Sequence, residues 1–483
     1  MQYPVIIRIL GLLLMLFSST MLPPVVVDWI YDEGVAAPFV DSFLLLLLIG
    51  ALLFLPFRNA RSELRRRDGF LVVVLFWFVL GSAGGLPMYL SDALSLSLTD
   101  AVFESMSGLT TTGATVISGL DDLPKSILFY RQELQWLGGM GIIVLAVAVL
   151  PMLGIGGMQL YRAETPGPVK DSKLTPRITG TAKALWLIYL GLTVACGLAY
   201  WAAGMTPFDA VAHAFSTVST GGNSTHDASL GYFDSVTIEL IAILFMLLSA
   251  VNFGLHFVAV RQRSLSVFFR DAEFRMFFLV LFGISLVIGG YLYLTDTFHS
   301  LGQGYVEGLF QVVSIGTSTG FTTQAFYTWP SFLPVLLIYV SFMGGCSGST
   351  SGGMKVVRVL LLFKQGSREL KRLVHPAGEF LVKVGRKPVP DKIIEAVWGF
   401  FAAYFALTIL MILMLMATGL DQDTAFSAVA ATLNNMGPGL GEVALGYAGI
   451  SDFAKWVLVM AMMLGRLEIF TLLVLFTPEF WRK

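Results

Sequence analysis

Long apolar runs alternate with short polar segments along the whole chain. A helix needs roughly 20 apolar residues to cross a bilayer. Such runs predict ten membrane spans, at about 4–27, 39–57, 69–94, 125–153, 180–204, 233–260, 274–295, 330–363, 393–419 and 453–477. The first run resembles a secretory signal, but its apolar residues continue to Val27 without a clear cleavage site, so we interpret it as a retained span. The expected fold class is an all-α polytopic membrane protein.

The composition agrees with membrane insertion and argues against other classes. Hydrophobic residues make up 56% of the chain and charged residues 13%, with a mean hydropathy of +0.77. A soluble domain carries about 25% charged residues. A net charge of −1 gives no reason to expect nucleic acid as a partner. Cys196 and Cys346 both fall in apolar runs, which predicts neither a disulfide framework nor a metal site.

Basic residues mark one side of the membrane. Of the 31 Lys and Arg residues, 27 fall near the N-terminus, at the C-terminus, or in the segments 58–67, 159–183, 261–275 and 355–392. The remaining loops contain acidic residues but no Lys or Arg, at 28–38, 95–124, 205–232, 296–329 and 420–452. Because cytoplasmic loops collect Lys and Arg, both termini are predicted to be cytoplasmic and the acidic loops to face outward.

Four of the outer loops share one pattern, a short helical stretch followed by a polar run that contains glycine. Their anchor glycines stand 109, 98 and 117 residues apart, at Gly113, Gly222, Gly320 and Gly437. Acidic residues stand 13 positions before the first three anchors and 14 before the last, at Asp100, Asp209, Glu307 and Asp423. Self-similarity of this kind indicates internal repeats. We expect two extra N-terminal spans at 1–68 and four span–pore loop–span repeats at 69–158, 159–272, 273–390 and 391–483.

Simple physics suggests what these loops do. An acidic residue that opens a helix is stabilised by the positive end of the helix dipole, and the negative end then points toward the membrane centre. The chain must return outward in an extended form, and its unpaired carbonyl groups are tolerated at that depth only around an aqueous path. There they can replace the hydration shell of an ion, and glycine lets the backbone turn them inward. Four re-entrant pore helices around one pseudo-fourfold axis therefore predict a cation filter.

Several motifs carry a resemblance to a known family. They are SGLTTTGAT at 107–115, TGFT at 319–322, NNMGPG at 434–439 and the ending GRLEIFT at 465–471. These motifs and their spacing resemble the Trk/Ktr/HKT potassium transporters over essentially the whole chain. The resemblance implies K⁺ uptake across a bacterial inner membrane, with K⁺ as the transported ion and no organic cofactor in this chain. It also implies a homodimer and a cytosolic nucleotide-binding regulatory subunit of the TrkA type.

By the same resemblance, K⁺ is held by backbone carbonyls of the two residues before each anchor glycine. These residues are Thr111, Thr112, Thr220, Gly221, Ser318, Thr319, Asn435 and Met436. The fourth loop departs from the others, because Asn-Met stands where the first loop has Thr-Thr and Pro438 follows its glycine. This asymmetry leaves the strictness of K⁺/Na⁺ discrimination open, and Rb⁺ is expected to pass as well.

The eighth span is interrupted at 344–353, where five glycines occur in ten residues. Each glycine costs a helix about 1 kcal/mol relative to alanine. Unpaired backbone at that depth should line the cavity. We expect a flexible gate on the cytoplasmic side of the filter, centred on Gly345, Cys346, Ser347 and Gly348. The alternative is a kink that packs against a neighbouring helix.

Arg466 lies about halfway along the last predicted span. A charge at that depth is expensive and usually functional. We expect it to face the cavity, where it would contact carbonyls of the Gly-rich segment or set a barrier to cations. Pairing with Glu468 is the alternative, although residues two apart do not share a helix face.

The segment 364–392 is the longest basic stretch on the predicted cytoplasmic side. Composition alone fits anionic lipid and a soluble regulator equally well. The family resemblance favours contact with the regulator.

Other functions fit the sequence less well. The sequence GCSG at 345–348 matches the GxSG motif of serine proteases, and His213 and His256 lie near or in predicted spans. A protease would need one of these histidines within hydrogen-bond reach of Ser347. Residues 348–355 only faintly resemble a phosphate-binding loop, and the sequence shows no soluble nucleotide domain, so no enzyme activity is expected. A symporter coupled to H⁺ or Na⁺ remains the alternative function, although such carriers usually contain two inverted halves.

Overall fold

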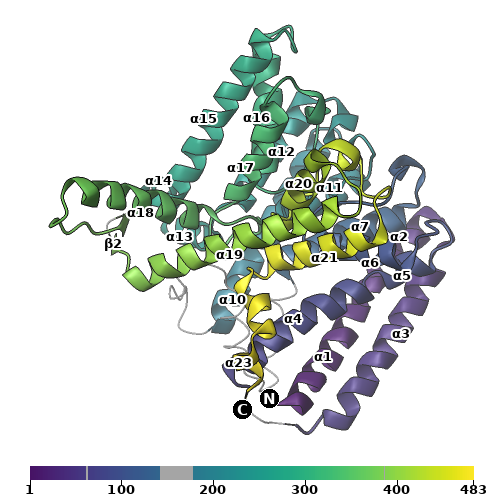
Figure 1. Ribbon diagram of the computed structural model, residues 1–483. Coiled ribbons are helices and arrows are strands. Elements are labelled where there is room, and N and C mark those ends of the chain that lie inside the picture. Colours follow the sequence, from purple (N-terminus) through teal and green to yellow (C-terminus); the bar gives the residue numbers. More distant parts are fainter. Residues whose placement is uncertain (61–63, 142–177, 386, 483) are drawn as a thin grey trace.

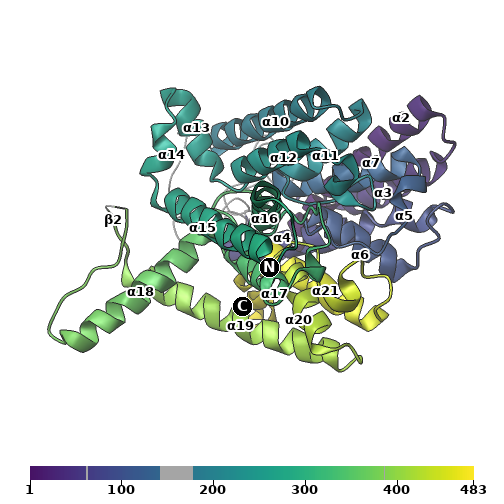
Figure 2. The ribbon, with the colours of Figure 1, turned by 90° about the horizontal axis from the view of Figure 1, so that it is seen from above.

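The computed structural model describes residues 1–60, 64–141, 178–385 and 387–482 (Figure 1). Part of the predicted span 125–153, the predicted boundary between the first two repeats, and four of the basic residues in 159–183 lie outside the described residues. The two termini lie close together in both ribbon views (Figures 1 and 2), and Figure 1 shows them at one end of the molecule. Contacts agree, because the backbone N–H of Gln2 donates to Asp68 and Arg67 donates to the Arg482 carbonyl.

The N-terminal unit is a helical hairpin. It consists of α1 (Tyr3–Ser18), the short α2 (Leu22–Tyr31) and α3 (Ala37–Phe54). Helices α1 and α3 run side by side (Figure 1). They touch at Gly11 and Gly50, where a Cβ atom on either residue would lie within 3 Å of the carbonyl oxygen of the other. Small residues allow this close approach, as is common between helices in membranes.

The described helices after residue 64 follow the predicted repeat order. The first unit contains α4 (Arg66–Ala83), α5 (Leu86–Leu90), α6 (Leu98–Leu109), α7 (Lys125–Trp136) and a π-helical turn (Leu137–Gly141). The second contains α10 (Ile178–Ala202), α11 (Pro207–Val218), α12 (Val236–Ser249), α13 (Phe253–Gln262) and α14 (Ser266–Arg270).

The third unit contains α15 (Ala272–Leu294), α16 (Leu301–Gly316), α17 (Leu333–Met343) and α18 (Val356–Val374). A small antiparallel hairpin, β1 (Lys383–Val384) and β2 (Lys387–Pro388), leads into the fourth. The fourth contains α19 (Asp391–Met416), α20 (Gln422–Leu433), α21 (Asp452–Arg466), α22 (Phe470–Leu473) and α23 (Pro478–Trp481).

Four short helices, α6, α11, α16 and α20, form the centre, and the units follow one another around them (Figure 2). Each packs against the long helix before it and the helix after it in its own unit. Each also packs against a helix of the preceding unit. These contacts are α11 on α7, α16 on α12, α20 on α17 and α6 on α21. The last contact joins the fourth unit to the first and closes the ring, as the predicted pseudo-fourfold arrangement requires.

Six described helices are long and apolar enough to cross a membrane, or up to eight if each of two bent pairs is one span. The bent pairs are α12–α13, at 96°, and α21–α22, at 108°. They correspond to the predicted spans 233–260 and 453–477. The predicted span 330–363 is divided at Gly344–Gly353 between α17 and α18. The chain is thus an all-α, multi-pass membrane protein, and the count of ten spans stays a prediction.

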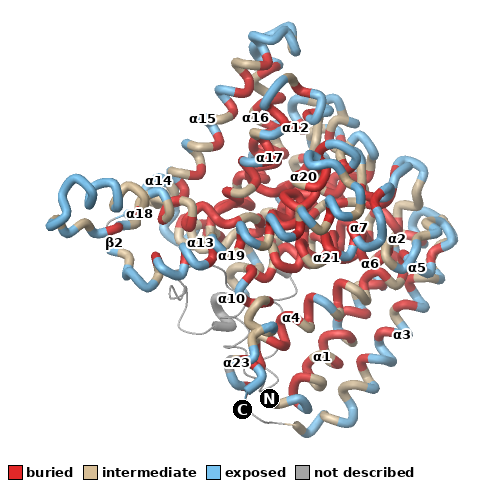
Figure 3. Tube along the Cα trace, viewed as in Figure 1, coloured by how far each residue is buried: buried red, intermediate tan, exposed pale blue. Residues whose placement is uncertain are grey.

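Burial separates the centre from the lipid face (Figure 3). The four short helices are mostly buried along their length. Helix α3 instead exposes one stripe at helical spacing, with Leu44, Leu48 and Leu52 all more than half exposed. Exposed apolar stripes on outer helices are expected where a membrane supplies the surroundings.

Candidate ion pathway

Each of the four central helices begins with a side-chain cap. The caps are Ser97, Thr206, Ser300 and Asp421, whose side-chain oxygens accept backbone N–H groups of the first turn. Asp100, Asp209 and Asp423 lie in the first turn of their helices, as predicted. Glu307 does not open its helix, because α16 begins six residues earlier, at Leu301, and has no acidic residue in its first turn.

The chain leaves these helices by the same turn four times. The residue two before each anchor glycine takes a left-handed conformation, with φ between 52° and 55°, at Thr111, Thr220, Ser318 and Asn435. The next residue donates its N–H to the carbonyl five positions earlier, over 2.7–2.8 Å, from Thr112, Gly221, Thr319 and Met436. The anchors themselves have φ between 79° and 91°. Only glycine adopts that region without steric cost.

The four loops touch one another in a closed ring. A Cβ atom on Gly113 would collide with the Gly221 carbonyl oxygen of the next loop. The same collision relates Gly222 to Thr319, Gly320 to Met436, and Gly437 to Thr112. In every case the carbonyl belongs to the residue just before the neighbouring anchor. The ring therefore brings together one predicted K⁺ ligand from each loop.

Beyond each glycine, the chain is tied to its own pore helix by a side chain. Thr225 Oγ1 donates to Asp209 over 2.8 Å, and Thr323 Oγ1 donates to Glu307 over 2.7 Å. Glu307 thus holds the segment of loop 3 that follows the anchor glycine. Asp209, which also stands 13 residues before its anchor, does the same in loop 2. In the fourth loop, Ser427 Oγ accepts the Leu440 N–H over 2.8 Å.

A buried ion pair stands behind the first and second loops. Arg131 Nε lies 2.8 Å from Glu104 Oε1, and both side chains are 1% exposed. The same guanidinium donates to Thr115 in loop 1 and to the Ser224 carbonyl in loop 2. Sequence reasoning did not single out either residue of this pair.

We expect Arg131→Ala to destabilise the protein by about 3–5 kcal/mol, because Glu104 would keep a buried and unpaired charge. The thermal unfolding midpoint of the detergent-solubilised protein measures this loss. The double variant Arg131→Met with Glu104→Leu should recover most of the stability. If Arg131→Ala is as stable as the unchanged protein, the pair has no structural role.

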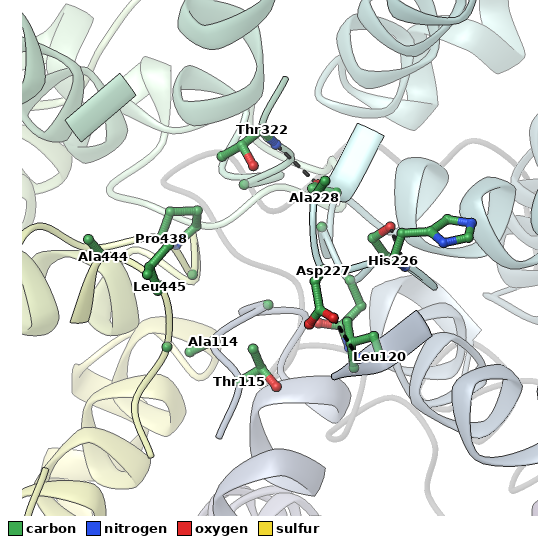
Figure 4. A pocket seen from close by; sticks show the side chains of 18 of the residues that line it. Ala114, Thr115, Leu120, His226, Asp227, Ala228, Thr322, Pro438, Ala444 and Leu445 are labelled. Carbon is green, nitrogen blue, oxygen red and sulfur yellow. Dashed lines mark hydrogen bonds between the residues drawn. The ribbon is translucent and has the colours of Figure 1, made fainter. Parts of the chain in front are cut away.

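The outer ends of the loops surround a cavity of about 340 Å³ (Figure 4). All four anchor glycines line it, at Gly113, Gly222, Gly320 and Gly437. Its walls come from all four repeats, with Thr115, Asp227, Thr322 and Pro438 around the opening (Figure 4). The cavity therefore adjoins the carbonyl ring on the side that is predicted to face outward, and we call it the mouth of the ring.

A histidine joins two of the loops at this mouth. His226 Nδ1 lies 2.5 Å from an Asp121 carboxylate oxygen, and Nε2 lies 3.5 Å from Asp209. Its ring stacks on Tyr232 and faces the ring of His213. Burial lowers the pKa of His226, but the Asp209 and Asp121 carboxylates outweigh it, so the pKa is raised above its usual value.

The raised pKa of His226 predicts a pH-dependent stability. The protonated ring ties Asp121 to loop 2, so its stabilisation is fully present below about pH 6.5 and is lost as pH rises through the raised pKa. Thermal unfolding from about pH 6 to about pH 9 should show the unchanged protein losing more stability than His226→Gln. Parallel curves for the two proteins would contradict this linkage.

The Gly-rich segment lies against the inner ends of the pore helices. Thr350 Oγ1 donates to the Val218 carbonyl at the end of α11, over 3.2 Å. Ser351 Oγ donates to the Thr317 carbonyl, over 2.5 Å, after α16. Gly352 lies so close to the Asn434 carbonyl after α20 that a Cβ atom would collide with it.

The four residues named as the gate lie to one side of these contacts. Cys346 donates its N–H to the Ala250 carbonyl, and the Gly348 carbonyl accepts the N–H of Phe253. Gly345 lies against the Ala250 carbonyl, and the Ser347 N–H donates to Glu273. They therefore pack the segment into the bend between α12 and α13. Sequence reasoning included Thr350, Ser351 and Gly352 in the Gly-rich segment 344–353 but centred the expected gate on the four residues before them. The hydroxyl-rich TSG sequence at 350–352 was the available signal for these contacts.

Arg466 is the last residue of α21 and points to the same place. Its guanidinium donates to the Thr350 carbonyl over 3.0 Å and to Thr111 Oγ1 over 3.3 Å. It also donates to the carbonyls of Gly138 and Gly139. Arg466 thus contacts the Gly-rich segment, the first filter loop and the π-helical turn after α7. Glu468, the suggested alternative partner, forms an ion pair with Arg358 at 2.5 Å.

No group of three or more His, Cys, Asp or Glu side chains is placed to hold a metal ion in the described ranges. The two histidines considered for a serine protease form hydrogen bonds with other groups. Both ring nitrogens of His213 are hydrogen-bonded, to Asp209 and Ser224, and His256 bonds to the Leu248 carbonyl.

A closed ring of four pore loops, each between membrane helices of one chain, defines a polytopic membrane protein of the fourfold-repeat pore class. Residues 36–483 match the TrkH family, described as a cation transport protein. The chain belongs to this family.

Several relatives are similar over their full length. The Trk system potassium uptake proteins TrkH of Vibrio parahaemolyticus and Halomonas elongata are 60% and 59% identical, and each alignment covers 100% of both chains. The Trk system potassium uptake protein TrkG of Escherichia coli is 42% identical, with 99% of both chains covered. These relatives are named as uptake proteins rather than as enzymes.

A solved structure has the same architecture. The crystal structure of the potassium transporter TrkH from Vibrio parahaemolyticus superposes with a TM-score of 0.91 at 57% sequence identity, and the match covers 100% of both chains. This similarity supports the all-α membrane fold over the whole length.

Proposed function

We propose that this protein carries K⁺ into a bacterial cell across the inner membrane, through a gated, channel-like pore. The carbonyl ring of Thr112, Gly221, Thr319 and Met436 is the observation that carries the proposal. Four pore helices point their C-terminal, partly negative ends toward the same centre, which favours a dehydrated cation there. Full-length relatives named as potassium uptake proteins support K⁺ as the ion.

The filter works by replacing water around the ion. Carbonyl groups before each anchor glycine take over the hydration shell. We assign this role to Thr111, Thr112, Thr220, Gly221, Ser318, Thr319, Asn435 and Met436. The left-handed residue in each loop supports the assignment, because it turns the chain sharply between the pore helix and the outward strand. Four non-identical loops make a filter that also admits Rb⁺.

The Gly-rich segment 344–353 is the gate in this proposal. Its contacts with the inner ends of α11 and α16 and with the Asn434 carbonyl after α20 support a position across the route from the filter to the cytoplasm. Arg466 adds a positive charge at the same level and holds the Thr350 carbonyl. Cations should pass only after the segment moves.

A cytosolic nucleotide-binding subunit of the TrkA type is the proposed agent of that movement. The helix α18 continues from the Gly-rich segment and carries basic residues Lys364, Arg368, Lys371 and Arg372 toward the predicted cytoplasmic side. A rigid helix attached to the gate is a direct route by which a partner could shift it. We further propose that the protein acts as a homodimer among membrane lipids, with both termini cytoplasmic.

Uptake of ⁸⁶Rb⁺ into liposomes that hold the purified protein tests the proposal. A K⁺ gradient should drive uptake without ATP, and Na⁺-loaded vesicles serve as the control. Uptake that instead follows an imposed H⁺ or Na⁺ gradient would favour the coupled symporter. If the chain alone gives no uptake, the cytosolic subunit is added, and continued absence of flux would refute the pore.

A further inference from the structure

One carboxylate holds the chain before and after the inner turn of the Gly-rich segment. Glu273 is the second residue of α15 and is 9% exposed. Its Oε1 atom accepts the backbone N–H of Ser347 over 2.7 Å and the backbone N–H of Val357 over 3.1 Å. These two donors lie ten residues apart, on either side of the Thr350–Gly352 turn that contacts the pore helices.

The segment between those two bonds is tightly folded. Val356 donates its N–H to the Gly345 carbonyl over 3.1 Å, and the Lys355 ammonium donates to the Ser351 carbonyl. Lys355 itself has φ of 74°, a left-handed conformation that side chains rarely adopt. Such a conformation persists only where the surrounding contacts impose it. Glu273 supplies a contact on each side of it.

The surroundings of this carboxyl group make both of its hydrogen bonds matter. Lys355 and Arg358 follow the segment, whereas Asp271 places a second acidic group two residues away and caps α15 by accepting the Phe274 N–H over 2.9 Å. A buried backbone N–H that loses its acceptor is left unsatisfied, which is costly. A single oxygen that accepts from two such donors therefore opposes the loss of the folded segment.

Helix α15 also connects this site with the predicted cytoplasmic surface. It follows directly after α14, which packs against α13, and its first turns pack against α18. The connecting stretch exposes four arginines, at Arg261, Arg263, Arg270 and Arg275. A displacement of α14 or of the start of α15 would carry the Glu273 carboxylate away from both N–H donors at once.

We propose that Glu273 is a latch, a positioning residue that keeps the Gly-rich segment seated beneath the filter until the α14–α15 junction moves. The inference rests on the proposed function, because it assigns the contact that controls the proposed gate. It also names the place where the regulatory partner must act, namely the arginine-bearing junction 261–275 in addition to α18.

Thiol labelling of Cys346 tests the latch without relying on transport. The chain has two cysteines, so Cys196→Ser leaves Cys346, which is 1% exposed and next to Ser347, as the single reporter. In full-length protein in liposomes, Glu273→Ala should raise the rate of N-ethylmaleimide labelling roughly tenfold, because two hydrogen bonds to backbone donors are lost. Uptake of ⁸⁶Rb⁺ without the partner should rise with it.

Two further variants separate the latch from a general loss of structure. Glu273→Gln keeps one acceptor oxygen, so labelling should be slower than in Glu273→Ala. Val357→Pro removes one donor while Glu273 stays intact, and proline is tolerated in the first turn of a helix, so it should also speed labelling. Glu239→Ala is the control, because Glu239 is a similarly buried glutamate in the first turn of α12.

The outcomes distinguish the latch from the gate. Labelling that stays slow in Glu273→Ala and in Val357→Pro would overturn the latch and leave the gate standing. Labelling that rises equally in Glu239→Ala would also overturn it. Faster labelling in both Glu273→Ala and Val357→Pro with no gain in ⁸⁶Rb⁺ uptake would support the latch and refute the segment as the barrier.

Discussion

Gly222→Ala is expected to abolish ⁸⁶Rb⁺ uptake in reconstituted liposomes. Its φ of 79° is unfavourable for alanine, and the new Cβ atom would collide with the Thr319 carbonyl. Relief of that collision must push the Thr319 carbonyl out of the ring, so the filter loses a ligand as well as its shape. Uptake should fall to the level of empty vesicles even when the gate is open.

Gly119→Ala is the matched control for this prediction. Gly119 also has a left-handed φ, 74°, and belongs to an outer loop, but a Cβ atom there would meet nothing within 4 Å. It should cost about 1 kcal/mol of stability and leave uptake unchanged. Equal loss of flux in both variants would mean that backbone strain, rather than the carbonyl contact, explains the result.

Deletion of residues 345–351 is expected to raise uptake by about tenfold or more in the absence of the regulatory partner. The deletion removes the contacts of Thr350 and Ser351 with the ends of the pore helices. If the segment is the barrier, the pore below the filter is then open at all times. Initial rates of ⁸⁶Rb⁺ entry at equal protein density provide the measurement.

A leak through damaged protein could also raise flux, and a double variant tests for it. The deletion combined with Gly222→Ala should return uptake to the level of empty vesicles, because ions would still have to cross the filter. Unchanged uptake after the deletion alone would contradict the gate. High uptake in the double variant would show that the ions bypass the four loops.

The filter loops could be predicted from sequence because their geometry depends on local residue types. A left-handed position that abuts a neighbouring carbonyl requires glycine, so Gly113, Gly222, Gly320 and Gly437 mark the ring in the sequence itself. Arg466 was predicted for a similarly local reason, since a charge within an apolar run needs a polar partner. Its contact with the Thr350 carbonyl agrees with that reasoning.

The residues at which helices begin and the contacts between distant parts of the chain were harder to predict. The acidic-residue pattern predicts Glu307 at the start of the third pore helix, whereas the cap is Ser300. Ser300 with Gln303 three positions later matches a capping box, so a signal for the true start was present in the sequence. Two predicted spans contain bends of 96° and 108°, which their continuous hydropathy does not indicate. Pairs such as Arg131 with Glu104, or Glu273 with Val357, join positions far apart in the chain and have no local sequence signal.

The most direct test of the central claim is a crystal structure of the protein grown in Rb⁺, with anomalous scattering used to locate the ion. The account predicts an anomalous peak on the axis of the four loops, bounded by the carbonyls of Thr112, Gly221, Thr319 and Met436. Peaks confined to other parts of the molecule, with none inside that ring, would contradict the assignment of the loops as the cation filter.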